Sequence, residues 1–388
     1  MIKLLSLFSG IGAFEKALTN LGVQYEVVNY CEIDKYASKS YSAIHGIPES
    51  KNLWDITKVD AFNLPKDIDL LTYGFPCQDI SLAGKQKGMF NEDGTLTRSG
   101  LFFKALDIIE CVKPKIAIAE NVKALTSKKF TEEFKIVLDS LEKAGYHNYW
   151  QVLNAKDYGM PQNRERVFIV SIRKDIDHYM FEFPKPYILE KRLKDFLEPY
   201  VDEKYYLSDD LISKIVCWEA HQKPFEKVLG DNSITPTLTA RGAGENHGQV
   251  TATIVNGDIK PKLVGGIGDK KSNGGTQYYQ QDRIYDSESI AMAHPANLTS
   301  GSYYYQVNTQ PLRIRKLTPK ECFRLMGFTD EDFSKAEQVP TSNAQLYKQA
   351  GNSIVVNVLE EILKELFINE KKPKRQTDQT RYEQLTLF

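Results

Sequence analysis

The chain has 388 residues, of which 41% are hydrophobic and 26% are charged, and its formal net charge is −1. This composition excludes a disordered or collagen-like chain, and the length suits two domains or one domain with an insertion. No apolar run reaches the ~18 residues of a membrane span, and the N-terminal segment shows no signal-peptide cleavage site, so we expect neither. Because bulk charge is near zero, a nucleic-acid partner requires locally clustered basic side chains.

The first half of the chain alternates short apolar runs with amphipathic stretches. This alternation predicts βαβ units, and therefore an α/β fold with a parallel sheet and helices on both faces. We expect strands at Ile2–Phe8, Tyr25–Cys31, Asp69–Tyr73, Ile116–Ala119 and Arg166–Ser171, and helices at Gly12–Leu21, Leu101–Val112 and Lys129–Ala144.

The second half has a different texture. Residues 204–311 are rich in Gly, Asn, Thr and Tyr, which predicts a smaller, irregular, strand-poor region with long loops. Helical patterns return at Pro319–Met326 and Ser353–Phe367, and the polar residues from Asn369 onward are expected to be disordered.

The cysteines are scattered, at positions 31, 77, 111, 217 and 322, with no CxxC pair. An odd, dispersed set argues against a disulfide framework and a structural zinc site. We therefore expect a reducing cytoplasm and no metal.

The first motif with chemical meaning is the Phe8-Ser9-Gly10-Ile11-Gly12 turn between a strand and a helix. An acidic residue, Glu32, ends the next strand, where a ribose-binding carboxylate lies in nucleotide-binding folds. The third glycine of the dinucleotide fingerprint is missing, which favours a nucleoside ligand without a pyrophosphate, such as S-adenosylmethionine. Taken alone, GxG could equally be a plain turn.

Three further motifs follow. Cys77, in Gly74-Phe75-Pro76-Cys77-Gln78, lies beyond a strand end and is a candidate nucleophile, the alternative being a small buried hydrophobe; the polar segment 81–98 after it resembles a mobile lid. Glu120, in Glu120-Asn121-Val122, also follows a strand, and could instead be a capping or ion-paired acid. Arg164 and Arg166 share one side of an extended segment and could bind a phosphate or a base, or form a solvated charge run.

In this order, FSGIG, the acid after the second strand, GFPCQ, ENV, QNRER and Gly351-Asn352-Ser353 resemble the cytosine-5 DNA methyltransferases of prokaryotes and phages. The resemblance covers the chain except residues 204–311 and the tail. It implies a Rossmann-like catalytic domain, and Cys77 adding to carbon-6 of cytosine. Glu120, with a raised pKa, would hydrogen-bond the ring nitrogen at position 3, and Arg166 and Arg164 would lie near the base oxygen.

The resemblance also implies S-adenosylmethionine as the methyl donor. Phe8, Ile11 and Gly12 would line its methionine and adenosine, Glu32 would take the ribose hydroxyls and Asp55 the adenine amine. The remaining matched positions are Ile33 on adenine, Ile56, Pro76 and Leu101 beside the cofactor, and Asn352 and Ser353 at the methionine end.

That last match implies that the C-terminal helix returns to the first domain, so the small domain is an insertion. We therefore expect a catalytic domain at 1–185, a small domain at 186–330 with target recognition at about 204–311, a returning segment at 331–368 and a flexible tail at 369–388.

Double-stranded DNA is the implied partner, with the target cytosine flipped out of the helix. The expected contacts are Gln78, Lys85 and Lys87 near the nucleophile and, in the recognition region, Gln280 in the vacated space and Arg283 on a guanine; Arg313, Arg315 and Lys316 form a further basic cluster. The sequence departs from the family where Met292-Ala293-His294-Pro295 replaces a Thr-Leu pair, and where Ala13 replaces a common glycine.

Alternatives remain at this level. A transfer-RNA cytosine-5 methyltransferase shares the core motifs but has a short variable region, a silent DNA-binding homologue would not need Cys77 and Glu120, and a nicotinamide-dependent dehydrogenase explains only GxG and Glu32. We expect a monomer in a prokaryotic cytoplasm, associated with the nucleoid and potentially part of a restriction-modification system. The C-terminal peptide Gln384–Phe388 resembles sliding-clamp docking peptides, and the alternative is a random apolar end.

Overall fold

A computed structural model describes residues 1–76, 89, 97, 99–178, 180–206, 208 and 313–369, together with the backbone of four short strands between 263 and 307. In the part of the chain so described, no helix has the length and hydrophobicity needed to cross a bilayer.

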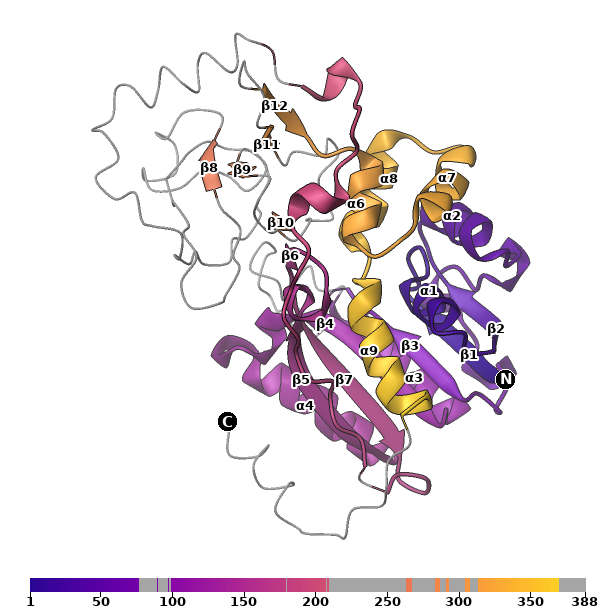
Figure 1. The fold of residues 1–388 in the computed structure, drawn as a ribbon. Coiled ribbons are helices and arrows are strands. Elements are labelled where there is room, and N and C mark those ends of the chain that lie inside the picture. Colours follow the sequence, from indigo (N-terminus) through magenta and orange to yellow (C-terminus); the bar gives the residue numbers. More distant parts are fainter. Residues whose placement is uncertain are drawn as a thin grey trace.

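A six-stranded sheet forms the centre of the larger lobe (Figure 1). Its first four strands in spatial order run parallel, and β7 is inserted antiparallel between β4 and β5. The order is β2 (Tyr25–Cys31), β1 (Ile2–Leu7), β3 (Leu70–Tyr73), β4 (Ile116–Val122), β7 (Glu165–Arg173) and β5 (Tyr146–Asn154).

The prediction of an α/β fold is therefore confirmed, but an all-parallel sheet is wrong. The strand at 165–173 runs antiparallel to its neighbours, and β5 was not predicted from the sequence. β5 lies at the sheet edge and most of its residues stay partly exposed, so it lacks the continuous apolar run that marks a central strand.

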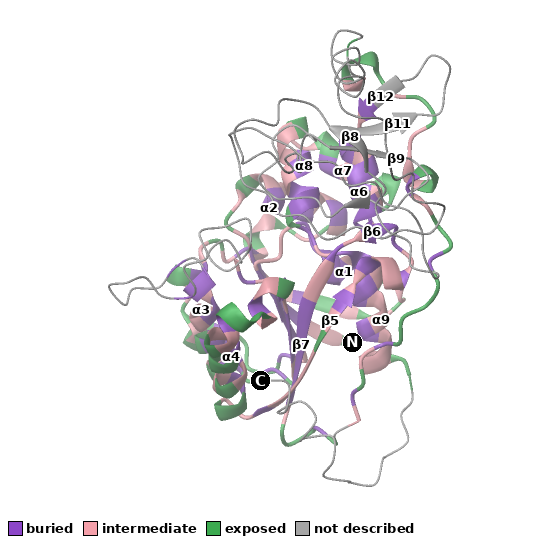
Figure 2. Cartoon of the chain, turned by 90° about the vertical axis from the view of Figure 1, so that its left-hand side faces the viewer, coloured by how far each residue is buried: buried purple, intermediate pink, exposed green. Residues whose placement is uncertain are grey.

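Helices cover both faces of the sheet (Figures 1 and 2). Successive strand residues point to opposite faces, so Leu4 belongs to one apolar cluster and Leu5 to the other. The first cluster is completed by α1 (Ala13–Asn20), α2 (Lys35–His45) and α9 (Val356–Phe367), and the second by α3 (Phe102–Val112) and α4 (Thr131–Lys143).

The C-terminal helices pack against the N-terminal ones, and α9 lies along α1. Three polar contacts join the two ends of the chain: Asn20 with Glu360, Lys16 with Asp332 at 2.7 Å, and Lys348 with Asp34 at 2.6 Å. These contacts come from α7 (Asp330–Gln338), α8 (Asn343–Asn352) and α9. The hydrophobic pattern of the sequence predicts the last helix but not α2, α7 or α8.

The smaller lobe contains a four-stranded sheet in the order β12 (Arg313–Lys316), β11 (Tyr304–Val307), β9 (Arg283–Asp286) and β8 (Leu263–Gly266). A further strand, β10 (Ala291–Met292), pairs in parallel with β6 (Gln162–Asn163) of the QNRER segment. The strand pairing between β6 and β10 therefore joins the two lobes directly.

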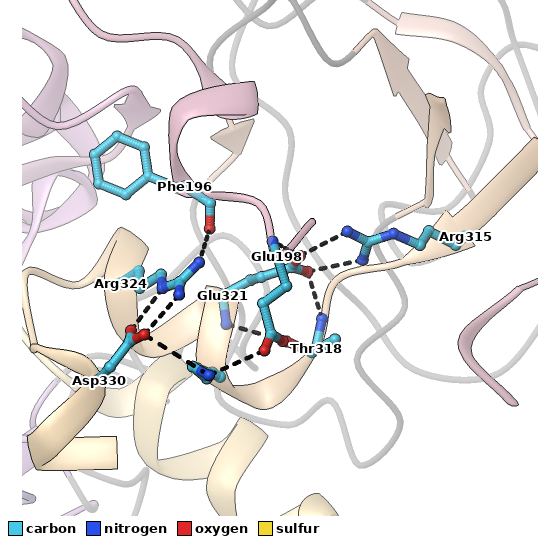
Figure 3. Close-up of polar contacts among 8 residues, drawn as sticks. Phe196, Glu198, Arg315, Thr318, Glu321, Arg324 and Asp330 are labelled. Atoms are coloured by element: carbon cyan, nitrogen blue, oxygen red, sulfur yellow. Dashed lines mark hydrogen bonds and ion pairs between the residues drawn. The ribbon is translucent and has the colours of Figure 1, made fainter. Parts of the chain in front are cut away.

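The chain leaves and re-enters the larger lobe beside α6 (Pro319–Leu325), where a buried ion pair joins Arg315 to Glu321 (Figure 3). The guanidinium donates to both carboxylate oxygens, at 2.6 and 2.9 Å, and the two side chains are 3% and 0% exposed. Glu321 also accepts the backbone N–H groups of Glu198 and Thr318. The expectation that Arg315 contacts a DNA phosphate is wrong, because its guanidinium is buried and paired with Glu321.

Candidate active site

The turn after β1 has an unusual backbone. Phe8, Gly10 and Gly12 all have positive φ, at 53°, 58° and 79°. For Phe8 this conformation is rare, and such strain is concentrated at functional sites. A hydrogen bond from the Ser9 N–H to the Cys31 carbonyl holds the turn against β2, and one from the Gly12 N–H to the Ser9 carbonyl closes the turn itself.

The two glycines of this turn have different roles. A Cβ on Gly12 would lie 2.2 Å from Nε2 of His45, which donates to the Ile11 carbonyl at 2.9 Å, so Gly12 is required by packing inside the protein. A Cβ on Gly10 would meet nothing within 4 Å. Open space therefore adjoins Gly10, whereas Gly12 and Ile11 are buried beneath the turn.

Glu32 follows β2 and faces this turn. Its two carboxylate oxygens accept the backbone N–H groups of Gly10 and Asp34, each at 2.8 Å. Burial raises the pKa of Glu32, and the two N–H donors oppose that shift by stabilising the ionised form. The carboxylate is thus fixed at the carboxyl edge of the sheet, where α/β proteins bind ligands.

The loop after β2 is tied to Glu32 by Asn52, a residue that was not predicted from the sequence. The buried Asn52 amide oxygen accepts the N–H groups of Glu32 and Trp54, and its NH₂ donates to the Glu32 carbonyl. Ile33, next in the chain, is 70% exposed, which is unusual for so large an apolar side chain. The local sequence gives no sign of this clamp, because the burial of Asn52 follows from the fold.

Asp55 caps the short turn Ile56–Lys58, and its Oδ1 accepts from the backbone N–H and the hydroxyl of Thr57. These hydrogen bonds lower the pKa of Asp55, so it carries its charge. Ile56 belongs to the core beneath the loop. The structure thus places Asp55 at the rim and Ile56 below it.

These residues fit a nucleoside. Gly10 leaves space, Glu32 offers fixed acceptor oxygens for hydroxyl groups, and Ile33 presents an apolar surface for a flat base. Of the residues described, no group of three or more His, Cys, Asp or Glu side chains is placed to hold a metal ion.

The second half of the site lies at the ends of β3 and β4. Because Glu120 is paired with Phe168 in the antiparallel register, Arg166 is its diagonal neighbour on the same face. Arg166 Nε lies 3.0 Å from Glu120 Oε1, and both side chains are mostly shielded from solvent. Burial raises the pKa of Glu120, although Arg166 and Arg164 pull it down. A carboxyl in this setting can hold a proton for a buried base.

The ENV segment also holds the turn that leads to Cys77. Asn121 donates from its amide nitrogen to the Phe75 carbonyl at 3.0 Å, and a Cβ on Gly74 would lie 3.6 Å from Glu120 Oε2. Pro76 is half-buried at the end of this turn. Cys77 itself lies outside the described residues, as do Gln78, Lys85, Lys87, Gln280 and the peptide 384–388, and Arg283 is described only as backbone in β9.

Arg164 is placed differently from Arg166. Its buried guanidinium donates to the carbonyl oxygens of Gly351 and Ser353, at 3.1 and 2.7 Å. It therefore ties the C-terminal Gly-Asn-Ser segment to the site, and its charge lowers the pKa of Glu120. Asn352 is exposed, Ser353 is buried, and Leu101 is half-buried at the start of α3.

A mixed sheet covered by helices on both faces, with a carboxyl edge whose residues fit a nucleoside, is the architecture of the Rossmann-like methyltransferases. The chain belongs to the family described as C-5 cytosine-specific DNA methylase, whose profile matches residues 2–368. The predicted enzyme class, a cytosine-5 DNA methyltransferase, is thereby confirmed.

Several relatives resemble most of the chain. The orphan methyltransferase M.SPRI of Bacillus phage SPR is 35% identical over 94% of this chain and 97% of its own, and type II methyltransferase M.HhaI of Haemophilus parahaemolyticus is 33% identical over 93% of each. Among solved structures, the Entamoeba histolytica methyltransferase EhMeth aligns with a TM-score of 0.62 at 16% identity, covering 96% of this chain and 99% of the other. The S. pombe Dnmt2 methyltransferase aligns with a TM-score of 0.58 at 20% identity, covering 95% and 98%. These structures share the fold.

Proposed function

We propose that this enzyme transfers a methyl group from S-adenosylmethionine to carbon-5 of a cytosine that has been turned out of a specific duplex DNA sequence, with Cys77 as the covalent nucleophile. The observation that carries the proposal is the pairing of Glu120 with Arg166 beside the Phe75 turn, which Asn121 holds in place immediately before Cys77. An acid, an arginine and the turn that precedes Cys77 thus lie at one edge of the sheet, which supports the proposal.

Carbon-5 of cytosine is a weak nucleophile, so the ring must first be activated. The Cys77 thiolate forms a bond to carbon-6, and the displaced electron pair moves toward carbon-5 and the ring nitrogen at position 3. Glu120, whose pKa burial raises, would in its protonated form hydrogen-bond that nitrogen and stabilise the charge, while Arg166 would orient the carboxyl and contact the base oxygen.

Bound S-adenosylmethionine supplies an electrophilic methyl group to carbon-5. Glu32 would bind the ribose hydroxyls, Ile33 would pack on the adenine and Asp55 would accept from its amine. After methyl transfer, loss of the proton from carbon-5 returns an electron pair to the ring, and Cys77 leaves as a thiolate. The enzyme is thus restored.

Double-stranded DNA would lie between the catalytic domain, 1–185, and the small domain, 186–330. Lys85 and Lys87 would contact phosphates, and Gln280 and Arg283 would read the target, as the family resemblance implies. Arg164 would not contact the base but would hold the backbone of Gly351 and Ser353 in place through hydrogen bonds to their carbonyl groups.

The direct test is methyl transfer from radiolabelled S-adenosylmethionine to duplex DNA, followed by bisulfite sequencing of the product. We expect methylation of one cytosine in a defined sequence, and none of an equivalent transfer RNA. Trapping on duplex DNA that carries 5-fluorocytosine should yield a covalent complex through Cys77, and Cys77→Ala should abolish the complex while still binding DNA. Absence of methylation on any DNA, or a crosslink through another residue, would overturn the proposal.

A further inference from the structure

An ion pair links α8, near the C-terminal end of the chain, to the edge of the sheet at which Glu32 lies. Lys348 Nζ lies 2.6 Å from Asp34 Oδ2, although 314 positions separate the two residues. The other oxygen of Asp34 accepts the N–H groups of Tyr36 and Ala37 and so caps α2. Asp34 is therefore held from two sides, by the start of its own helix and by α8.

Asp34 in turn holds Glu32. Its backbone N–H donates to Glu32 Oε1 at 2.8 Å, while the Gly10 N–H donates to Glu32 Oε2 at the same distance. A shift of Asp34 consequently moves one of the two donors that fix the carboxylate. The chain of contacts runs from Lys348 through Asp34 to Glu32 without a gap.

We propose that Lys348, through its ion pair with Asp34, is a positioning residue that sets the Glu32 carboxylate for the ribose of S-adenosylmethionine, so that α8 takes part in cofactor binding. The inference rests on the proposed function, because it assumes that Glu32 binds the cofactor. It assigns a role to a residue that stands shortly before Gly351-Asn352-Ser353 and belongs to none of the motifs named in the sequence analysis.

The charges around Glu32 make the role testable. Lys348 on α8 lowers the pKa of Glu32 and Asp34 raises it, whereas burial raises the pKa of the nearby Cys31 thiol to about 12 and that of Tyr30 above its usual value, so both stay neutral. The two partners of the ion pair thus act on Glu32 with opposite sign. If the ion pair only held α8 in place, replacing Lys348 and replacing Asp34 would not shift the pKa of Glu32 in opposite directions.

The experiment is calorimetric binding of S-adenosylmethionine to the full-length protein without DNA, as a function of pH. The variants are Lys348→Met, Lys348→Arg and Asp34→Asn, which keeps a side-chain oxygen to cap α2. Lys335→Met is the matched control, since Lys335 pairs with Glu331 on the exposed face of α7. Because the Lys348 and Asp34 side chains are 43% and 22% exposed, we expect Lys348→Met to raise Kd about twofold to fivefold.

Lys348→Arg should retain most of the affinity, and Lys335→Met should equal the wild type. Binding requires ionised Glu32, so affinity falls as the solution is acidified. Lys348→Met should move that fall to higher pH and Asp34→Asn should move it to lower pH. Thermal unfolding of the unliganded variants reports any loss of stability separately.

The outcomes separate the two proposals. If the wild type fails to bind S-adenosylmethionine, the proposed function fails and this inference falls with it. If the wild type binds but Lys348→Met has the same Kd, the positioning role is overturned while the proposed function stands. The same holds if the pH at which affinity falls moves in the same direction in Lys348→Met and Asp34→Asn, or does not move in either.

Discussion

Glu120 and Arg166 lie on neighbouring antiparallel strands, offset by two residues in register, and their side chains meet with Oε1 and Nε 3.0 Å apart. The offset places both side chains on one face of the sheet, at the edge where the motif loops converge. Because burial raises the pKa of Glu120 and Arg166 lowers it, the protonation of this acid depends on its neighbour.

The first prediction concerns this acid. Methyl transfer should fall as pH rises above the raised pKa of Glu120, since only the protonated carboxyl can donate to the base. Glu120→Gln keeps a donor but cannot supply a proton, so we expect single-turnover rates about 10²-fold lower, without the alkaline decline. Rapid-quench rates across pH measure both effects, and an unchanged alkaline limb in Glu120→Gln would assign that limb to another group.

Asn121 should set the position of the cysteine loop. Removing its amide in Asn121→Ala leaves the Phe75 carbonyl without this donor, so the turn before Cys77 loosens. We expect the methyl-transfer rate to fall about tenfold or more, with little change in S-adenosylmethionine affinity. Asn148→Ala is the control, because Asn148 donates to a backbone carbonyl of α4 away from the site. Equal effects of the two substitutions on the rate would contradict a positioning role for Asn121.

The two glycines of the first turn should respond differently to alanine. Both have positive φ, but only at Gly12 would the new methyl group overlap His45. Gly10→Ala should cost about 1 kcal/mol of unfolding free energy and Gly12→Ala about 3 kcal/mol or more. Urea denaturation measures both. His45→Ala in the Gly12→Ala background should recover part of the loss, and no recovery would assign the loss to backbone strain together with the Tyr41 ring, which lies 2.9 Å from the added carbon.

Removing one partner of the buried Arg315–Glu321 ion pair should destabilise the protein more than replacing both partners. Glu321→Gln removes the carboxylate charge that faces the buried guanidinium of Arg315, which should cost about 3–5 kcal/mol of unfolding free energy. The double variant Arg315→Met, Glu321→Leu should be more stable than Glu321→Gln, because no lone charge remains. Chemical denaturation of the three proteins provides the comparison, and a double variant less stable than the single would show that the surrounding N–H donors need the carboxylate.

The sequence was most informative where chemistry is local. The motif loops follow strand ends, so their order along the chain predicts which side chains meet at the edge of the sheet, and Glu120 and Arg166 do meet there. Helix α2 was missed because its serines weaken the helical pattern, although Asp34 and Gly46 mark its two ends as caps.

Side-chain contacts that depend on distant parts of the chain could not be predicted from the sequence. Arg315 stands in a basic run that suggests an exposed cluster; Glu321 is only six positions away, but the distant Glu198, whose N–H donates to Glu321, belongs to the same buried group. Arg164 and Arg166 are two positions apart and read alike, yet one ends on backbone carbonyls of the C-terminal segment and the other on a carboxylate. Their different partners depend on where a segment nearly two hundred residues later returns.

The packing of α9 on α1 has a consequence for biosynthesis. One face of the central sheet receives its last covering helix only when residues 356–367 have left the ribosome, although the strands beneath it are made first. The nascent protein therefore carries an open apolar flank through most of translation. A premature stop before Val356 would leave that flank permanently uncovered, and such a fragment should be a substrate for chaperones and proteases rather than a partly active enzyme.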